Sequence, residues 1–237
     1  MSETFASPGE SDPSAAERLL EAACTHVPFD GWSETTLRAA AEDAGVAPGL
    51  ARALFPRGAV DLALAYHRAG DAEMARRFAA EAAAGEHDEM RYSEKVARAV
   101  RLRLEIADRE LVRRGAALFA LPQHATDGAR AVWGSADAIW TALGDSSDDY
   151  NWYSKRATLS GVYGSVVLFW LGDDSVDNQA SWQFLDRRIG DVMRFEKTKG
   201  RVMASPLGRL LERGPLGLLG RVRAPQRASD LPGHQGS

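Results

Sequence analysis

The sequence predicts an all-α protein. Nearly every segment between residues 14 and 200 places apolar residues at helical spacing, and no stretch of useful length alternates as a strand would. The helical segments are separated by short links, which is typical of helical bundles, and no internal repeat is present. With 237 residues, the chain can form one large domain or two small ones around a sizeable core.

The N-terminal helices are predicted to be short. The first is marked by an amphipathic set, Leu19, Leu20, Ala23, Cys24 and Val27. Ser33 is an N-cap candidate for the second, and Gly45 allows the chain to leave it. A third helix is expected over Pro48–Phe55, because Pro56 follows it directly.

Longer helices are predicted over residues 59–83, 92–106, 110–120, 127–143, 151–171 and 178–199. The segment 157–171 is the most apolar, but it is too short to span a bilayer and is interrupted by small and polar residues. The last helix carries an apolar stripe that fits either a core or a two-fold interface, formed by Trp182, Leu185, Ile189, Val192 and Met193.

The N-terminal helices resemble the helix-turn-helix of TetR-type repressors. The resemblance rests on Gly31, Thr36, Ala40, Ala41, Ala44-Gly45-Val46, Pro48-Gly49, Phe55-Pro56 and Leu62. Where that family commonly carries Tyr, His and Lys, this chain has Arg52, Leu54 and Gly58. Residues 1–60 also carry a net charge of −5, which would repel DNA. We therefore expect the fold without nucleic-acid binding; the alternative is a TetR-type repressor with a lipid effector.

Four regions are expected along the chain. Residues 1–13 form a polar, disordered tail, 14–58 the helix-turn-helix-like part, 59–200 a helical ligand-binding bundle, and 201–237 a basic tail. Residues 194–227 carry a net charge of +7, so the two ends of the chain should meet different partners.

The basic tail is predicted to bind a membrane surface. Apolar and basic residues alternate there at amphipathic spacing, which is typical of helices that lie in a membrane interface. The residues concerned are Leu207, Arg209, Leu210, Leu211, Arg213, Leu216, Leu219, Arg221 and Arg223. The alternative is a tail that folds back on the body or stays disordered.

The sequence carries no recognisable catalytic or metal-binding pattern. The five histidines lack paired metal-ligand spacing, and there is no Glu-x-x-His repeat, phosphate-binding loop or nucleophile elbow. We therefore expect no enzyme activity, no metal and no cofactor. The single cysteine, Cys24, excludes an internal disulfide and fits a reducing compartment.

The segment 145–156 combines acidic turn residues with the adjacent aromatics Trp152 and Tyr153. Neighbouring helical positions point about 100° apart, so one core cannot easily bury both rings. Aromatics ringed by charge are typical of protein-binding hot spots. The alternative is that both rings pack on the next helix and cap the core.

The chain resembles the accessory lipid-binding family of ubiquinone (coenzyme Q) biosynthesis, the ninth of the numbered coenzyme Q proteins. The matching segments lie between about residues 18 and 200. They are His26-Val27-Pro28, Gly31-Trp32, Leu121-Pro122-Gln123-His124, Ile139-Trp140, Gly144-Asp145, Asp149-Tyr150-Asn151-Trp152-Tyr153, Arg156, Tyr163 and Trp182-Gln183-Phe184-Leu185.

The resemblance implies a protein without catalytic activity that binds an isoprenoid or other lipid, such as a ubiquinone precursor. It also implies docking to the di-iron demethoxyubiquinone hydroxylase through Asp137, Ile139, Trp140, Asp149, Trp152, Tyr153 and Arg156. By analogy with TetR-type folds a homodimer is expected. The mitochondrial members carry a leader that this sequence lacks, so we expect a bacterial protein, cytoplasmic and peripheral to the inner membrane.

The residues give the lipid cavity some support of their own. Apolar side chains gather on two predicted helices, and we expect the cavity to be lined by Leu118, Phe119, Leu121, Val162, Val166, Val167, Phe169 and Trp170. Gly161 and Gly164 remove side-chain bulk and so allow close approach of a ligand or a neighbouring helix.

Overall fold

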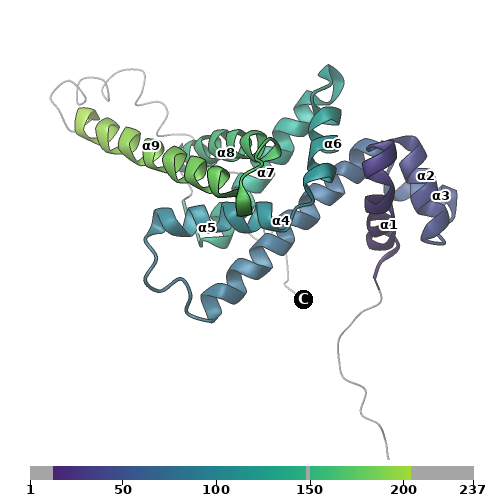
Figure 1. Ribbon diagram of the computed structural model, residues 1–237, viewed down its shortest axis with the longest axis horizontal. Coiled ribbons are helices and arrows are strands. Elements are labelled where there is room, and N and C mark those ends of the chain that lie inside the picture. Colours follow the sequence, from purple (N-terminus) through teal and green to yellow (C-terminus); the bar gives the residue numbers. More distant parts are fainter. Residues whose placement is uncertain (1–12, 148–149, 204–237) are drawn as a thin grey trace, which may run out of the picture. The chain divides into compact units, whose positions relative to one another are not determined.

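The computed structural model describes residues 13–147 and 150–203, and within them all regular secondary structure is helical. The all-α prediction is confirmed. The α-helices are α1 (Ala15–Asp30), α2 (Glu34–Asp43), α3 (Pro48–Leu54), α4 (Ala59–Ala83), α5 (Tyr92–Glu105), α6 (Arg109–Phe119), α7 (Ala125–Ala142), α8 (Tyr150–Leu171) and α9 (Gln179–Met203) (Figure 1). Two 3-10 turns precede α7 and α9, η1 (Pro122–His124) and η2 (Val176–Asn178).

The N-terminal helix ends follow local capping chemistry. Ser14 begins α1 with a capping box, in which its hydroxyl accepts from the amide of Glu17 and the Glu17 carboxylate accepts from the Ser14 amide. Ser33 caps α2 by accepting from the amide of Thr36 at 3.1 Å, as the sequence predicts. Gly45 has φ +62°, a conformation that glycine adopts without strain, so α2 can turn into α3.

The chain forms two compact units whose sequences interleave. The first unit takes the described residues up to His67 together with Asp108–Gly128, and the second takes Arg68–Ala107 and the described residues from Ala129. Helices α4 and α7 therefore each contribute to both units. This division differs from the predicted one, because α6 packs on α1 and shares the core of the N-terminal helices.

The first unit is built on an apolar core that includes Leu19, Val27, Trp32, Leu62 and Leu111, all nearly fully buried. The indole N–H of Trp32 donates a hydrogen bond to the backbone carbonyl of Leu111 in α6 at 3.1 Å. The buried indole N–H therefore has an acceptor.

In the second unit α8 packs on α9, and α9 also packs on α5 (Figure 1). Its apolar core includes Val100, Ile139, Leu159, Val166 and Leu185. A polar group is buried within it: Arg103 donates to Asp71 at 2.7 Å, and the hydroxyl of Ser135 donates to the same carboxylate oxygen at 2.6 Å.

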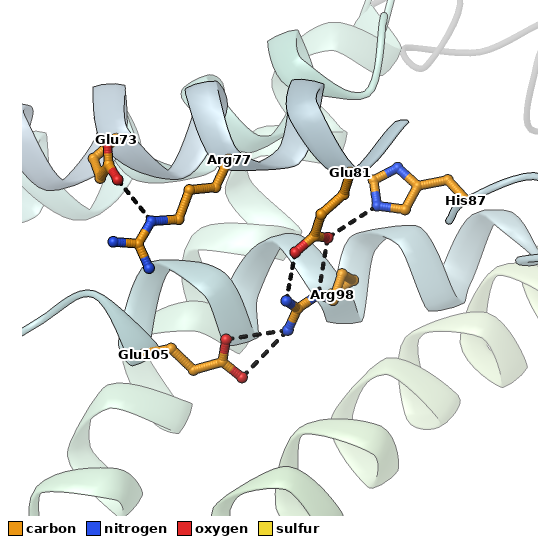
Figure 2. Close-up of polar contacts among 6 residues, drawn as sticks. All are labelled: Glu73, Arg77, Glu81, His87, Arg98 and Glu105. Atoms are coloured by element: carbon orange, nitrogen blue, oxygen red, sulfur yellow. Dashed lines mark hydrogen bonds and ion pairs between the residues drawn. The ribbon is translucent and has the colours of Figure 1, made fainter. Parts of the chain in front are cut away.

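The end of α4 is tied to α5 by a chain of ion pairs. Arg98 donates to Glu81 and, through another nitrogen, to Glu105, and His87 contacts Glu81 at 3.2 Å (Figure 2). The His87 ring also lies 4.2 Å from the ring of Phe78, measured between centroids. This buried histidine closes the turn after α4 and is fully accounted for by these structural contacts.

Two predicted regions fall largely outside the described residues. Residues 1–12, and with them nearly all of the predicted N-terminal tail, are not described. The same holds for residues 204–237, which include every predicted membrane-binding residue from Leu207 to Arg223. Within the described ranges, no helix combines the length and the apolar character needed to cross a membrane.

Candidate functional site

The second unit contains an apolar cavity of about 310 Å³. It lies among α5, α7, α8 and α9, and its walls are formed by Tyr92, Ser93, Val96, Trp140, Ser154, Lys155, Thr158, Leu159, Val162, Ile189, Val192 and Met193. Cavities that bind small ligands are commonly apolar, with a few polar groups that fix the ligand's orientation. The hydroxyls and the single ammonium group of this cavity fit that description.

One side of the cavity is aromatic and cationic. The rings of Tyr92 and Trp140 stack with centroids 5.9 Å apart, and the ammonium nitrogen of Lys155 lies 5.5 Å from the centroid of the Trp140 ring. Partial burial, the largest effect, raises the pKa of Tyr92. A phenol is protonated at neutral pH even at its ordinary pKa, so this hydroxyl can donate a hydrogen bond. A flat ring that bears oxygen atoms would find stacking surfaces and hydrogen-bond donors here.

Of the predicted lipid-binding residues, the structure places only Val162 on this cavity. Val166 and Trp170 are buried in the core, Val167 is half-buried, and Phe169 stacks on Phe184 at 4.6 Å between centroids. Leu118, Phe119 and Leu121 lie in the first unit, where Leu118 and Phe119 pack on its core and Leu121 is exposed.

Gly161 and Gly164 do not line this cavity, and they do not allow the close approach that the sequence predicts. A Cβ atom added at Gly161 would meet no atom within 4 Å, and at Gly164 it would make an ordinary contact of 3.8 Å with Val132. Neither position therefore allows a closer approach than alanine would. The signal that could have found the cavity is the apolar stripe of α9, since Ile189, Val192 and Met193 form one of its walls.

The predicted partner-binding residues of α7 and α8 are held together by Arg156. Its side chain is completely buried, with Nε donating to Asp137 at 2.5 Å and Nη1 donating to Asp145 at 3.1 Å. The guanidinium carbon lies 4.0 Å from the centroid of the Trp152 ring, a cation–π contact. Arg156 thus supports the ring of Trp152 from beneath.

We call the face formed by Asp137, Trp133, Trp152 and Tyr153 the aromatic surface. Its three rings are in contact: Trp152 lies 4.8 Å from Tyr153 and 6.1 Å from Trp133, between centroids. All four residues are half-buried, so each presents part of its side chain. Trp133 was not foreseen, because it lies 19 positions before Trp152 and only the packing of α7 on α8 brings the rings together.

The remaining predicted partner-binding residues lie elsewhere. Ile139 is fully buried in the core, and Trp140 faces the cavity. Asp149 lies outside the described residues. The adjacent aromatics in the sequence predict a protein-binding surface here, and that stays a prediction; the sequence does not show that Arg156 is buried beneath them.

The buried carboxylate of Asp145 accepts hydrogen bonds from three side chains around it. Its Oδ1 accepts from the ammonium of Lys155 at 2.6 Å and from the hydroxyl of Ser147 at 2.8 Å, and its Oδ2 accepts from Arg156. Burial alone would raise the pKa of Asp145, but these hydrogen bonds outweigh it and lower the pKa to about 2. The residue is therefore ionised throughout the physiological range.

Because of Asp145, the free energy of unfolding should fall as the pH is lowered into the acid range. Its pKa falls from an ordinary value of 3.8 to about 2 on folding, and each pKa unit corresponds to about 1.4 kcal/mol, so it contributes about 2 kcal/mol. Because the folded-state pKa is the lower one, this contribution is present above about pH 4 and is lost as the pH falls towards 2. Urea unfolding between pH 5 and 2 should show a weaker pH dependence in Asp145→Asn than in wild type; equal slopes would contradict the assignment.

Helix α3 presents little that could hold a phosphate backbone. Its base Arg52 pairs with Glu34, Nη2 donating to Oε2 at 2.6 Å, and Leu50 and Leu54 are exposed on the same helix. A recognition helix needs free bases and polar side chains.

Among the described residues, no group of three or more His, Cys, Asp or Glu side chains is arranged to hold a metal ion.

Comparisons with known proteins match this chain to one family. Residues 125–196, which contain α7, α8 and most of α9, match the family model described as COQ9. The chain is 29% identical to the "Ubiquinone biosynthesis protein COQ9, mitochondrial" of Rattus norvegicus, over 88% of this chain and 67% of that protein. It is 27% identical to the human protein of that name, over 88% and 66%.

A shorter match to a protein of Dictyostelium discoideum, named "Probable ubiquinone biosynthesis protein coq9, mitochondrial", has 36% identity over 46% of this chain and 36% of that protein. The chain spans about two thirds of the length of the rat and human relatives. The cavity and the aromatic surface both draw on the matched helices α7 and α8. The resemblance to the ubiquinone-biosynthesis family that the sequence indicates is thereby confirmed: the chain is similar to the COQ9 proteins, most clearly over residues 125–196.

Proposed function

We propose that this chain is a non-enzymatic accessory protein of ubiquinone biosynthesis that binds an isoprenoid or quinone precursor. The observation that carries the proposal is the apolar cavity among α5, α7, α8 and α9, in a chain related to proteins named for ubiquinone biosynthesis. Its volume of about 310 Å³ is at the lower end of the range for ligand pockets. It suits a substituted ring with a short apolar segment better than a whole polyprenyl chain.

Docking of the di-iron demethoxyubiquinone hydroxylase is the second part of the proposal. The aromatic surface is a half-buried group of two tryptophans and a tyrosine with an adjacent carboxylate, and it is fixed by the buried Arg156. Rigid aromatic groups of this kind are what tight protein interfaces use as anchors. The accessory protein would hold the precursor while the partner enzyme performs the chemistry.

Membrane contact and dimerisation complete the proposal. The basic segment 194–227 has a net charge of +7, which favours anionic lipid headgroups by about 1 kcal/mol for each nearby Lys or Arg. Exposed apolar side chains on the second unit, such as Val176, would be covered in a homodimer. The protein would then act as a homodimer at a membrane surface.

Filling the cavity should abolish ligand binding. Thr158 lies on the cavity wall, and a tryptophan there would occupy much of the space that the ligand needs. We expect wild-type protein to retain a quinone or isoprenoid, identified by mass spectrometry of an organic extract, and Thr158→Trp to retain at least about tenfold less, which corresponds to 1.4 kcal/mol.

The matched control is Leu168→Trp, because Leu168 is on the same helix, is exposed, and does not line the cavity. It should retain the ligand as wild type does. If Thr158→Trp retains as much ligand as Leu168→Trp, the cavity is not the binding site.

A further inference from the structure

Asp145 contacts both candidate sites. On one side its carboxylate accepts from Lys155, which lines the cavity, at 2.6 Å. On the other side it accepts from Arg156, on which the ring of Trp152 is stacked, at 3.1 Å. Lys155 and Arg156 are consecutive residues of α8, so one buried carboxylate joins the cavity wall to the base of the aromatic surface.

One nitrogen of the Arg156 guanidinium makes no hydrogen bond to any described residue in this arrangement. Its Nη2 is buried and finds no hydrogen-bond acceptor in the described part of the chain, while Nη1 is shared between Asp145 and the carbonyl of Trp152, at 3.1 and 3.3 Å. A buried donor without an acceptor is unfavourable. A carboxylate can accept two parallel bonds from one guanidinium, so Asp145 could satisfy Nη2 if it were released from Lys155.

We propose that the ligand controls the aromatic surface through Asp145. An oxygen atom of a ligand in the cavity competes with Asp145 for the ammonium of Lys155. Once released, Asp145 takes both Nη atoms of Arg156, and the guanidinium shifts beneath Trp152. The inference rests on the proposed function, because it takes the cavity as the ligand site and the aromatic surface as the docking site.

We call the contacts from Lys155 through Asp145 to Arg156 the relay. In this proposal the relay has two discrete arrangements, and such a two-state element is what can couple two sites. In the arrangement seen here, Lys155 is bonded to Asp145 and Ser147 and Arg156 is incompletely paired. In the other, Lys155 is bonded to the ligand and Arg156 is paired twice with Asp145. Since coupling is reciprocal, a partner that favours the second arrangement of the aromatic surface must also raise affinity for the ligand.

A ligand-free experiment tests the relay by itself. Lys155→Met removes the ammonium and keeps the apolar stem, which imitates its capture by a ligand. We expect the indole N–H resonance of Trp152, assigned by its absence in Trp152→Phe, to shift in Lys155→Met and to return towards its original position in Lys155→Arg. Thr158→Val is the matched control, because Thr158 lines the same cavity and makes no hydrogen bond to Asp145 in the described structure.

An unchanged Trp152 resonance in Lys155→Met would overturn the relay, and so would an equal shift in Thr158→Val, because a general loosening of the cavity would then explain both. Unfolding curves of each variant show whether it is folded. A variant of Lys155 that fails to fold is replaced by Asp145→Asn, which should shift the same resonance.

A second arm adds ubiquinone with a single isoprene unit as the probe. We expect saturable shifts of both the Trp140 and the Trp152 resonances, and a change in the probe's Kd of about fivefold or more on Trp152→Ala, which is the lower range of allosteric coupling. In the Lys155→Met background, Trp152→Ala should leave that Kd unchanged. If the probe binds nowhere, the proposed ligand is wrong, while the ligand-free arm still decides whether the relay exists.

Discussion

Replacing Arg103 with methionine should lower the free energy of unfolding by about 3–5 kcal/mol, because it strands a buried carboxylate without its compensating charge. The side chains of Arg103 and Asp71 are only 3% and 11% exposed, and Nε donates to Oδ1 at 2.7 Å. The loss is far larger than for surface pairs, in which water replaces the missing partner. Urea unfolding of both proteins at pH 7 gives the difference directly.

Two further variants show whether the stranded charge is the cause. Arg76→Met breaks an ion pair with Glu73 on the same face of α4, but the Arg76 side chain is 69% exposed, so we expect a change below about 1 kcal/mol. Asp71→Asn combined with Arg103→Met removes both charges and keeps an acceptor for the hydroxyl of Ser135, so it should recover much of the lost stability. If the double variant is as unstable as Arg103→Met alone, lost packing outweighs the charge.

The same buried pair explains a glycine that the helical pattern leaves unexplained. Gly70 lies inside α4, where glycine is unfavourable relative to alanine. A Cβ atom added there would lie 2.7 Å from the guanidinium carbon of Arg103. Gly70 therefore gives Arg103 the room to reach Asp71, a reason that depends on how α4 and α5 pack and that periodicity alone cannot reveal.

The helices themselves were predictable because their signals are local. The range 59–83 coincides with α4, and Ser33 and Gly45 delimit α2 as predicted. Such signals depend on residues within a few positions of one another, through capping and side-chain spacing. Each helix boundary could therefore be read without knowing what the helix packs against.

The cavity was not predictable to the same degree, because it is a property of four helices at once. Of the residues predicted to bind lipid on α8, Val162 lines the cavity, whereas Val166 and Trp170, one and two turns further along, are core residues. An apolar residue that faces a cavity and one that faces a neighbouring helix look alike in sequence. The interleaving of the two units was hidden for the same reason, since only the packing of α6 on α1 reveals it.

Buried charge was the hardest feature to foresee. The sequence places Arg156 beside acidic and aromatic residues, which suggests an exposed base, yet its side chain is completely buried between Asp137 and Asp145. Arginine is rarely buried without partners. Here the partners come from the end of α7 and the segment after it, so the burial follows from tertiary contacts that no local pattern encodes.

Replacing Trp152 with aspartate should weaken docking to the di-iron hydroxylase by about 30-fold or more, the factor that corresponds to a hot spot of about 2 kcal/mol. The change removes the ring that contacts Trp133 and Tyr153 and places a third carboxylate near Asp137 and Asp145. It removes an anchor and adds repulsion, and both effects oppose binding. The measurement is the Kd for the purified hydroxylase, by titration calorimetry.

Gly161→Asp is the control that separates this surface from the rest of α8. Gly161 is exposed, an added Cβ there meets nothing within 4 Å, and nine residues of helix place it about half a turn away from Trp152. It introduces the same charge on the same helix, so a general electrostatic effect would weaken docking in both variants. If Trp152→Asp is folded and binds as wild type does, the hydroxylase docks elsewhere; if only Trp152→Asp loses binding, the rings that Arg156 supports form the docking site.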